Sequence, residues 1–404
     1  MTVQILFLGI VFVTIFSILA WRKPLYLALL AGMLVTVALY RIDPVTAVKV
    51  IALETVSREN ITTLLSFYFI TLLQKMLVRR NRLKKAQASF DRLIRNRRLN
   101  IILSTSVMGL LPSSAIMSVC AEMVDKTGDR YLDNKEKMAV SCYYRHIAEM
   151  FVPTFTPVIL MLSLTSVNPG MFMLSMIPPA VTACVILYFV YLRKMPEELP
   201  PLSKPVSRKT ELRSLAKNLW SLAAVVLIIA IFGLPIYFAA PIVIVLDYFI
   251  DHFTLKEVPV LLKNAAEVSL LCNIYLVMLF KAVLAEAGAI EALVSFFNGM
   301  ALSPIVTFAL IFFFGTVVSG SQAIIAICIP LVFAVIPDGG VPLCAMLMGI
   351  SWAAMQISPT HVCTYVAGEY YKTSLNDIIV KLAPSVAAVA LFSYCYGIIL
   401  MHFI

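Results

Sequence analysis

The sequence predicts an all-α polytopic membrane protein, made of two inverted repeats that each hold five spans and one re-entrant hairpin. Composition, loop charge and an internal repeat predict it. Of the 404 residues, 61% are hydrophobic and 13% are charged, whereas soluble domains are about half apolar and about a quarter charged. A soluble fold is therefore excluded. Runs that approach or exceed the ~20 residues of a membrane span lie at 5–19, 25–40, 61–77, 171–191, 222–250 and 383–404.

Two of these runs need interpretation. Residues 1–20 have no basic first segment and no Ala-x-Ala site, so they are predicted to be the first span and not a cleaved signal peptide. The run 222–250 is interrupted by Gly233-Leu234-Pro235 and must hold two spans. The eight cysteines lie in apolar stretches without a CxxC pair. They are predicted to be packing residues, with no disulfide or metal framework.

The net charge of +10 is confined to short connections. Because Lys and Arg concentrate on the cytoplasmic side of membrane proteins, the basic connections are predicted to be cytoplasmic and both termini extracytoplasmic. The protein is expected in the cytoplasmic (inner) membrane of a prokaryote, in contact with lipid and with no nucleic-acid partner. The basic connections are 22–23, 79–98, 126–137, 193–217, 256–263 and 372–381, and those without Lys or Arg are 164–170, 233–235, 284–303 and 336–341.

The chain repeats itself at a nearly constant offset. Gly109 and Gly315, Pro153 and Pro359, and Lys75 and Lys281 are each 206 residues apart, and a block at Pro24 matches one at Pro235 with an offset of 211. An odd number of spans in the first half inverts the second half, an arrangement typical of secondary transporters. The five predicted spans of the first half are 3–20, 24–40, 58–78, 138–163 and 169–193.

One apolar segment in each half is predicted to be a re-entrant hairpin. Residues 99–125 break at Pro112-Ser113-Ser114 between two basic connections, and residues 304–335 break at Ser319-Gly320-Ser321-Gln322 between two connections without lysine. Each segment should therefore enter and leave on one side of the membrane. Non-helical backbone at membrane depth is tolerated only where it is buried in protein or lines a wet cavity. The polar tips are therefore predicted to face a site.

The following span of each half is predicted to be a broken helix. The span 138–163 contains Pro153-Thr154 and Thr156-Pro157, and the span 341–366 contains Ser358-Pro359-Thr360-His361. Each proline removes a backbone donor from the helix, and an ordinary kinked span is the alternative. Broken helices expose carbonyls that suit Na⁺ and N–H groups that suit a carboxylate.

The candidate site follows from these breaks. Na⁺ is predicted at Ser113/Thr154 and at Ser319/Thr360, with carbonyls and hydroxyls as ligands. The predicted helix breaks are Pro112, Pro153, Pro157, Gly320 and Pro359. The predicted substrate- and ion-binding residues are Ser113, Ser114, Thr154, Thr156, Ser319, Ser321, Gln322, Ser358, Thr360 and His361.

Ionisable residues inside the membrane are further candidates. Arg145, His146 and Glu149 share a helical face by their spacing. Arg145 and Glu149 could neutralise each other as a structural pair. Alternatively, Arg145 or His146 attracts an anion, or His146 and Glu149 carry a coupling proton. His361 is either a neutral imidazole bonded to backbone or a substrate ligand or proton acceptor.

Two basic features receive structural interpretations. Lys75 and Lys281 lie near the ends of their spans, and they are predicted to snorkel to the membrane surface. The run 79–98 mixes apolar and basic residues, which indicates an amphipathic helix against anionic lipid.

The repeated hairpin and broken helix, with serine-rich tips and Ser/Thr-Pro breaks, resemble the ion transporter superfamily. That group includes divalent-anion/Na⁺ symporters and an uncharacterised prokaryotic family of integral membrane proteins, which the chain resembles in particular. The sodium symporters carry Ser-Asn-Thr at both tips, where this chain has Pro112-Ser113-Ser114 and Ser319-Gly320-Ser321. The resemblance implies an elevator-type transporter in which the hairpins and broken helices move against a dimerising scaffold. It implies scaffold parts at 1–98 and 218–303, transport parts at 99–193 and 304–404, and a cytoplasmic linker at 194–217.

The predicted function is secondary active transport of a small, carboxylate-bearing anion, coupled to Na⁺ or H⁺ and without a further cofactor. An amino acid would use the same groups. The chain is not expected to be an enzyme. The alternatives are a channel, a non-transporting membrane scaffold, and an intramembrane hydrolase with Ser319 or Ser321 as nucleophile and His361 as base.

Overall fold

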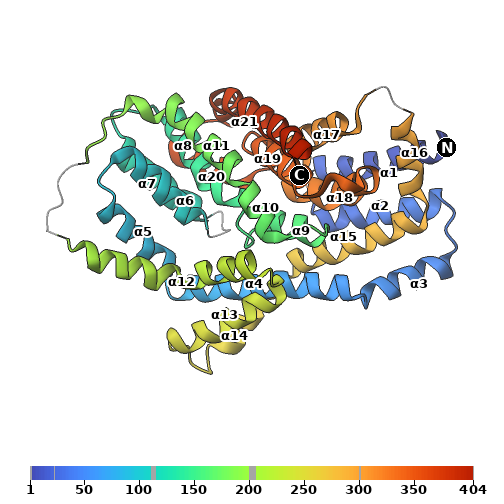
Figure 1. The fold of residues 1–404 in the computed structure, drawn as a ribbon, viewed down its shortest axis with the longest axis horizontal. Coiled ribbons are helices and arrows are strands. Elements are labelled where there is room, and N and C mark those ends of the chain that lie inside the picture. Colours follow the sequence, from blue (N-terminus) through green and yellow to red (C-terminus); the bar gives the residue numbers. More distant parts are fainter. Residues whose placement is uncertain (1, 22, 111–114, 200–205, 300–301, 404) are drawn as a thin grey trace.

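The fold is helical throughout the part of the chain that the structure describes. The computed structural model describes all residues except 1, 22, 111–114, 200–205, 300–301 and 404 (Figure 1). Within these ranges, loops join helices α1 to α21 and three short 3-10 helices. The described residues also contain one isolated β-bridge, between Asn96 and Glu198. Seven helical stretches of the described residues are long and apolar enough to cross a membrane. The predicted all-α class is confirmed.

The first helices pack together with a helix from the second half. Helix α1 (Thr2–Ala20) packs on α2 (Leu25–Leu39), and α2 packs on α15 (Val268–Glu286). Helix α4 (Arg58–Arg79) follows a short helix, α3 (Pro44–Thr55), in a stretch between two of the predicted spans. Asp43 accepts hydrogen bonds from the first turn of α3, and Pro44 stands at its first position. Both are helix-start signals.

The second half opens with α12 (Arg208–Phe232), α13 (Ile236–Ile250), α14 (Val258–Ala265), α15 and α16 (Ala289–Asn298). The interruption predicted at Gly233 is present: its φ of +62° places it in the left-handed region at the end of α12. Glycine adopts that conformation without a steric penalty. The apolar run 222–250 therefore divides into two helices.

Helix α5 (Arg82–Leu93) is amphipathic as predicted, but its buried face lies against protein. Leu83 is 1% exposed, and α5 packs along α12. Ser89 and Ser214 join the two helices through a 2.8 Å hydrogen bond. Helix α5 is therefore part of the folded body, with its remaining face free for another contact.

Each half contains one helical hairpin, at the corresponding place in its order of helices. Helices α6 (Arg97–Gly109) and α7 (Ala115–Gly128) pack together, and their predicted tip at Pro112, Ser113 and Ser114 lies outside the described residues. Helices α17 (Pro304–Ser319) and α18 (Ser321–Val335) form the second hairpin. Gly320 joins them with φ of +85°, which favours glycine.

Both predicted broken helices are interrupted in the structure. Helix α8 (Asn134–Arg145) is followed by η1 (Ile147–Met150) and then, after Pro153, by α9 (Thr156–Ser163). Helix α19 (Gly340–Met355) is separated from α20 (Val362–Tyr371). Every residue of α19 from Pro342 to Met355 is buried, so this helix lies in the core of the bundle. The remaining elements are α10 (Pro169–Ser175), α11 (Ile177–Val190), η2 (Leu192–Lys194), η3 (Pro337–Gly339) and α21 (Leu375–Phe403).

Two reciprocal ion pairs join α4 to α15. Lys75 near the end of α4 pairs with Glu267 at the start of α15 at 2.5 Å, and Lys281 of α15 pairs with Glu59 of α4 at 2.6 Å. The two helices are therefore antiparallel and exchange the same kind of contact. The two lysines, predicted to snorkel, each have an acidic partner.

Candidate functional site

The break between α19 and α20 is held by a hydroxyl network. The Ser358 hydroxyl donates to Val317 O of the second hairpin at 2.7 Å, and it accepts from the Thr360 backbone N–H at 3.2 Å. The Ser358 and Thr360 hydroxyls are 2.8 Å apart. Ser319, at the end of α17, donates to Gly315 O at 2.7 Å. The second hairpin and the second broken helix, separated in sequence, are thus joined at their polar breaks.

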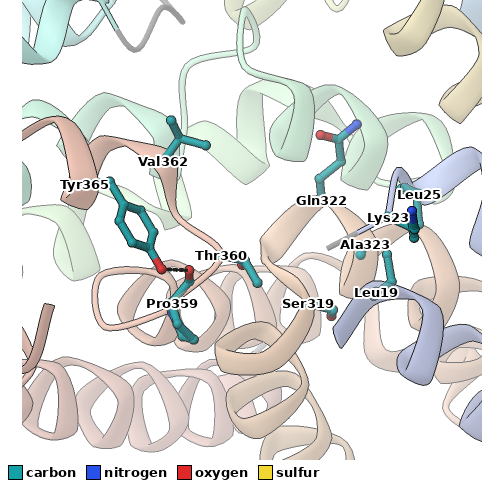
Figure 2. Close-up of a pocket in the computed structure, with 10 residues that line it drawn as sticks. All are labelled: Leu19, Lys23, Leu25, Ser319, Gln322, Ala323, Pro359, Thr360, Val362 and Tyr365. Carbon is teal, nitrogen blue, oxygen red and sulfur yellow. Dashed lines mark hydrogen bonds between the residues drawn. The ribbon is translucent and has the colours of Figure 1, made fainter. Parts of the chain in front are cut away.

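A cavity of about 440 Å³ opens beside this network. We call it the first cavity (Figure 2), and its polar side chains come from three parts of the chain. Ser319 and Gln322 belong to the second hairpin, Thr360 to the break, and Lys23 to the corner between α1 and α2. The starts of α18 and α20 both reach this cavity. Its lining residues are Leu19, Lys23, Leu25, Ser319, Gln322, Ala323, Pro359, Thr360, Val362 and Tyr365.

The break in the first half lies beside a smaller cavity of about 160 Å³, which we call the second cavity. Thr154 and Thr156 line it together with Gln74 and the Lys75–Glu267 ion pair. Gln74 Nε2 donates to Thr154 O at 2.9 Å, whereas the buried Thr154 hydroxyl has no hydrogen-bond partner. An unpaired buried hydroxyl costs free energy, so Thr154 is available to a ligand. Pro112, Ser113 and Ser114, predicted to lie near it, are not among the described residues.

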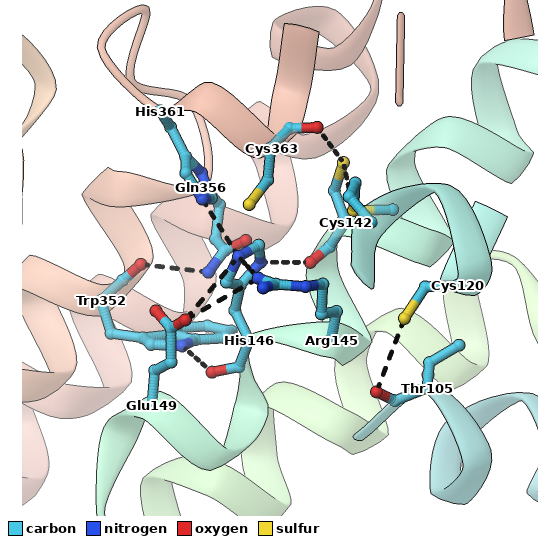
Figure 3. Close-up of polar contacts among 11 residues, drawn as sticks. Thr105, Cys120, Cys142, Arg145, His146, Glu149, Trp352, Gln356, His361 and Cys363 are labelled. Carbon is cyan, nitrogen blue, oxygen red and sulfur yellow. Dashed lines mark hydrogen bonds and ion pairs between the residues drawn. The ribbon is translucent and has the colours of Figure 1, made fainter. Parts of the chain in front are cut away.

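The predicted ionisable residues gather in a third place, the Arg145 cluster (Figure 3). Arg145 Nη1 lies 2.6 Å from His146 Nε2 and 3.8 Å from Glu149 Oε1. His361 Nε2 lies 3.0 Å from the same His146 nitrogen. Arg145 is 2% exposed and His146 is fully buried. The cluster therefore joins the break of the first half to the start of α20.

Neighbouring polar residues hold this cluster. Trp352 Nε1 donates to His146 O at 2.6 Å, and Gln356 Nε2 lies 3.5 Å from Trp352 O. The Gln356 side-chain oxygen is buried without a hydrogen-bond partner. Sequence reasoning missed Lys23, Gln74, Trp352, Gln356 and Cys363. Of these five residues, only Trp352 had a signal in the sequence, because it lies 206 residues after His146 and so corresponds to it in the repeat.

The structure also bears on the hydrolase alternative. A serine nucleophile needs its base within hydrogen-bond reach. The Ser319 hydroxyl donates to Gly315 O, the buried Ser321 hydroxyl has no hydrogen-bond partner, and His361 Nε2 faces His146. Neither serine is therefore bonded to the histidine in the described structure.

The two cavities and the cluster offer complementary chemistry. Helix starts present free N–H groups and the positive end of the helix dipole, which favour an anion. The starts of α18 and α20 and the amine of Lys23 all reach the first cavity. Hydroxyls and carbonyls at both breaks suit a hard cation. These features define an all-helical, membrane-type protein with interrupted helices around polar cavities.

The chain belongs to the family described as "Protein of unknown function (DUF401)", which matches residues 4–399. No curated protein matches the chain. Among solved structures it is similar to the YdaH transporter of Alcanivorax borkumensis, whose crystal structure is described as having an unusual topology. Identity is 12%, with 88% of this chain and 89% of that chain covered and a TM-score of 0.48. The resemblance to the ion transporter superfamily stays a prediction.

Proposed function

We propose that this chain is a secondary transporter that moves a small, carboxylate-bearing anion across the cytoplasmic membrane of a prokaryote. The first cavity carries the proposal, because two helix starts and Lys23 meet there beside the hydroxyls of Ser319 and Thr360. A carboxylate is favoured by N–H groups and a cation together.

Three observations support an inverted repeat. The order span, span, short helix, span, short helix, hairpin and broken helix occurs twice, in α1–α9 and in α12–α20. The ion pairs Lys75–Glu267 and Lys281–Glu59 exchange equivalent residues across α4 and α15. Trp352 donates to His146, its counterpart at the 206-residue offset. Such contacts arise where two similar halves meet around a pseudo-two-fold axis.

An elevator mechanism fits the distribution of the breaks. The hairpins and broken helices form the proposed transport part, at 99–193 and 304–404, and the scaffold parts lie at 1–98 and 218–303. The cavity-lining residues Lys23 and Leu25 belong to the scaffold, whereas Gln322 and Thr360 belong to the transport part. The first cavity therefore lies between the two parts. A homodimer through the scaffold, a cytoplasmic linker at 194–217 and extracytoplasmic termini complete the proposal.

The substrate test uses purified protein and proteoliposomes. A thermal-shift screen against carboxylates, sugar acids and amino acids, each with and without Na⁺, selects the ligand, because a ligand stabilises the state that binds it. Uptake of that ligand should then saturate and show counter-transport, and a channel would do neither. Lys23→Gln should raise the concentration for half-maximal uptake by up to about fivefold, since Lys23 is exposed and an exposed ion pair contributes up to about 1 kcal/mol. Lys49→Gln, on the exposed face of α3, is the matched control and should leave uptake unchanged.

The coupling ion is tested on the same vesicles. Ser319→Ala should raise the Na⁺ concentration needed for half-maximal uptake if Na⁺ binds at Ser319/Thr360. Uptake that ignores Na⁺ and follows pH would instead assign coupling to His146 and Glu149. Uptake unaffected by either gradient would contradict secondary transport.

A further inference from the structure

The Arg145 cluster contains a set of metal-type ligands that the proposed Na⁺ sites do not use. The ligand atoms of His146, His361 and Cys363 all lie within 4.8 Å of one another. Imidazole nitrogens and thiolates are the ligands that soft transition metals prefer, whereas Na⁺ prefers oxygen. We propose that His146, His361 and Cys363 bind a single Cu⁺ ion. The cysteine was expected to be a packing residue, and this proposal gives it a different role.

The surroundings already orient one ligand. His146 Nδ1 is hydrogen-bonded to Cys142 O, and a carbonyl can only accept, so the proton must be on Nδ1. The lone pair of His146 is therefore on Nε2, which faces His361 Nε2 at 3.0 Å. Metal-binding histidines commonly donate their other N–H to a backbone carbonyl in this way. The Trp352 bond to His146 O fixes the backbone at the same residue.

The spacing is close to that of a bound ion. The zinc distances of about 2.0–2.1 Å to nitrogen and about 2.3 Å to sulfur, taken as a guide for Cu⁺, would hold ligand atoms about 3.3–3.8 Å apart. The two imidazole nitrogens are 3.0 Å apart, and the sulfur lies within 4.8 Å of both. Movements of about 1 Å by the ligand atoms would bring them to the distances found around a bound ion. Arg145 Nη1, now 2.6 Å from His146 Nε2, must turn towards Glu149, whose Oε1 is 3.8 Å away.

Charge favours a monovalent ion. The guanidinium of Arg145 and the carboxylate of Glu149 offset each other, and a thiolate offsets one further positive charge. A divalent ion would leave an excess charge in a buried site between apolar helices, which is costly. When the copper–sulfur bond forms, the Cys363 thiol releases its proton to solvent. The proton of His361, which donates from Nε2 to His146 in the metal-free structure, moves to Nδ1 so that Nε2 can bind the ion. A further soft atom lies nearby, since Cys142 Sγ is 3.9 Å from Cys363 O.

The site lies at the junction of the two broken helices. His146 caps the end of α8, and His361 and Cys363 flank the start of α20. His361 directly follows Thr360, which lines the first cavity. A bound ion would tie the two halves together at their breaks (Figure 3). This inference does not depend on the proposed transport activity.

The test titrates ascorbate-reduced Cu⁺ without oxygen into the purified full chain, against a chromogenic Cu⁺ chelator. The wild-type protein should remove one equivalent from the chelator and should melt at a higher temperature when loaded. Cys363→Ser and His361→Asn should each weaken binding at least tenfold, and Cys395→Ser, at an exposed cysteine, should not. Zn²⁺ should bind more weakly than Cu⁺.

A second measurement avoids variants that fail to fold. In the wild-type chain, one equivalent of Cu⁺ should slow maleimide modification of Cys363 and leave the rate at Cys395 unchanged, as read by mass spectrometry. The proposal is wrong if the wild-type chain leaves Cu⁺ on the chelator, if Cys363 is not protected, or if Cys363→Ser binds as tightly as wild type. Zn²⁺ binding as tight as that of Cu⁺ would overturn the charge argument.

Discussion

Arg82 shows how a single charged residue is accommodated in this bundle. Its side chain is 2% exposed, and it pairs with Asp247, which is fully buried, and with Asp251. It also donates to Lys217 O at the start of the apolar part of α12. Arginine suits such a site because its planar group donates in several directions at once. The run 79–98 therefore contains two kinds of basic residue, and only the exposed ones can meet lipid.

Replacement of Arg82 should test this distinction. Arg82→Met leaves the Asp247 carboxylate buried without its partner, and loss of one member of a buried pair costs about 3–5 kcal/mol. Lys85→Met is the matched control on the same helix, because Lys85 is exposed, and exposed charges contribute about 0–1 kcal/mol. Urea unfolding in detergent measures both. Equal losses in the two variants would show that Arg82 is not a buried structural charge.

At the scale of elements, the hairpins and broken helices depend on close backbone approach. A Cβ atom at Gly109, at the end of α6, would lie 1.8 Å from Arg145 O. The Ser106 hydroxyl, one turn earlier, donates to Tyr144 O at 3.0 Å. Helix α6 therefore contacts the end of α8 through small residues. Gly109 and Gly315 were matched by the repeat, but their offset alone could not show what each glycine touches.

A Gly109→Ala variant should be strongly destabilised. The added methyl group meets a backbone atom, which cannot rotate away as a side chain could, and overpacking of this kind costs about 1–3 kcal/mol or more. Gly9→Ala in α1 is the control, since nothing lies within 4 Å of its added Cβ and alanine favours a helix by about 0.5–1 kcal/mol. The two variants should shift the melting temperature in opposite directions. An unchanged melting temperature for Gly109→Ala would contradict the close approach.

At the scale of the whole molecule, the proposed scaffold and transport parts meet at the two cavities. The corner between α1 and α2 contributes Lys23, α4 contributes Gln74 and Lys75, and the N-cap of α15 contributes Glu267. The breaks contribute Thr154 and Thr360. A hairpin that returns to its own side of the membrane cannot line both faces of a fixed pathway. If the chain transports, its tip must move together with the site.

Crosslinks between the parts should reveal that movement. A Leu25→Cys/Gln322→Cys pair, placed on opposite parts around the first cavity, should crosslink in the register seen here. A second scaffold position along α2 should crosslink to Gln322→Cys in another register. Each crosslink should stop uptake, and reduction should restore it. One register alone, with crosslinked protein that still transports at the wild-type rate, would favour a rocking or gated pathway.

The sequence by itself determined the membrane-type helical class, the split at Gly233, the breaks near Pro153 and Pro359, and the grouping of Arg145, His146 and Glu149. These features depend on local composition, proline chemistry and helical spacing, which act over a few residues. Only the tertiary structure decided that Lys75 and Lys281 pair with Glu267 and Glu59, that α5 lies on α12, and that Lys23 faces Thr360 across a cavity. Such contacts join residues about 100 to 340 positions apart. Which distant side chains meet depends on which helices pack against one another and at what angle. No repeating pattern in the sequence shows that arrangement.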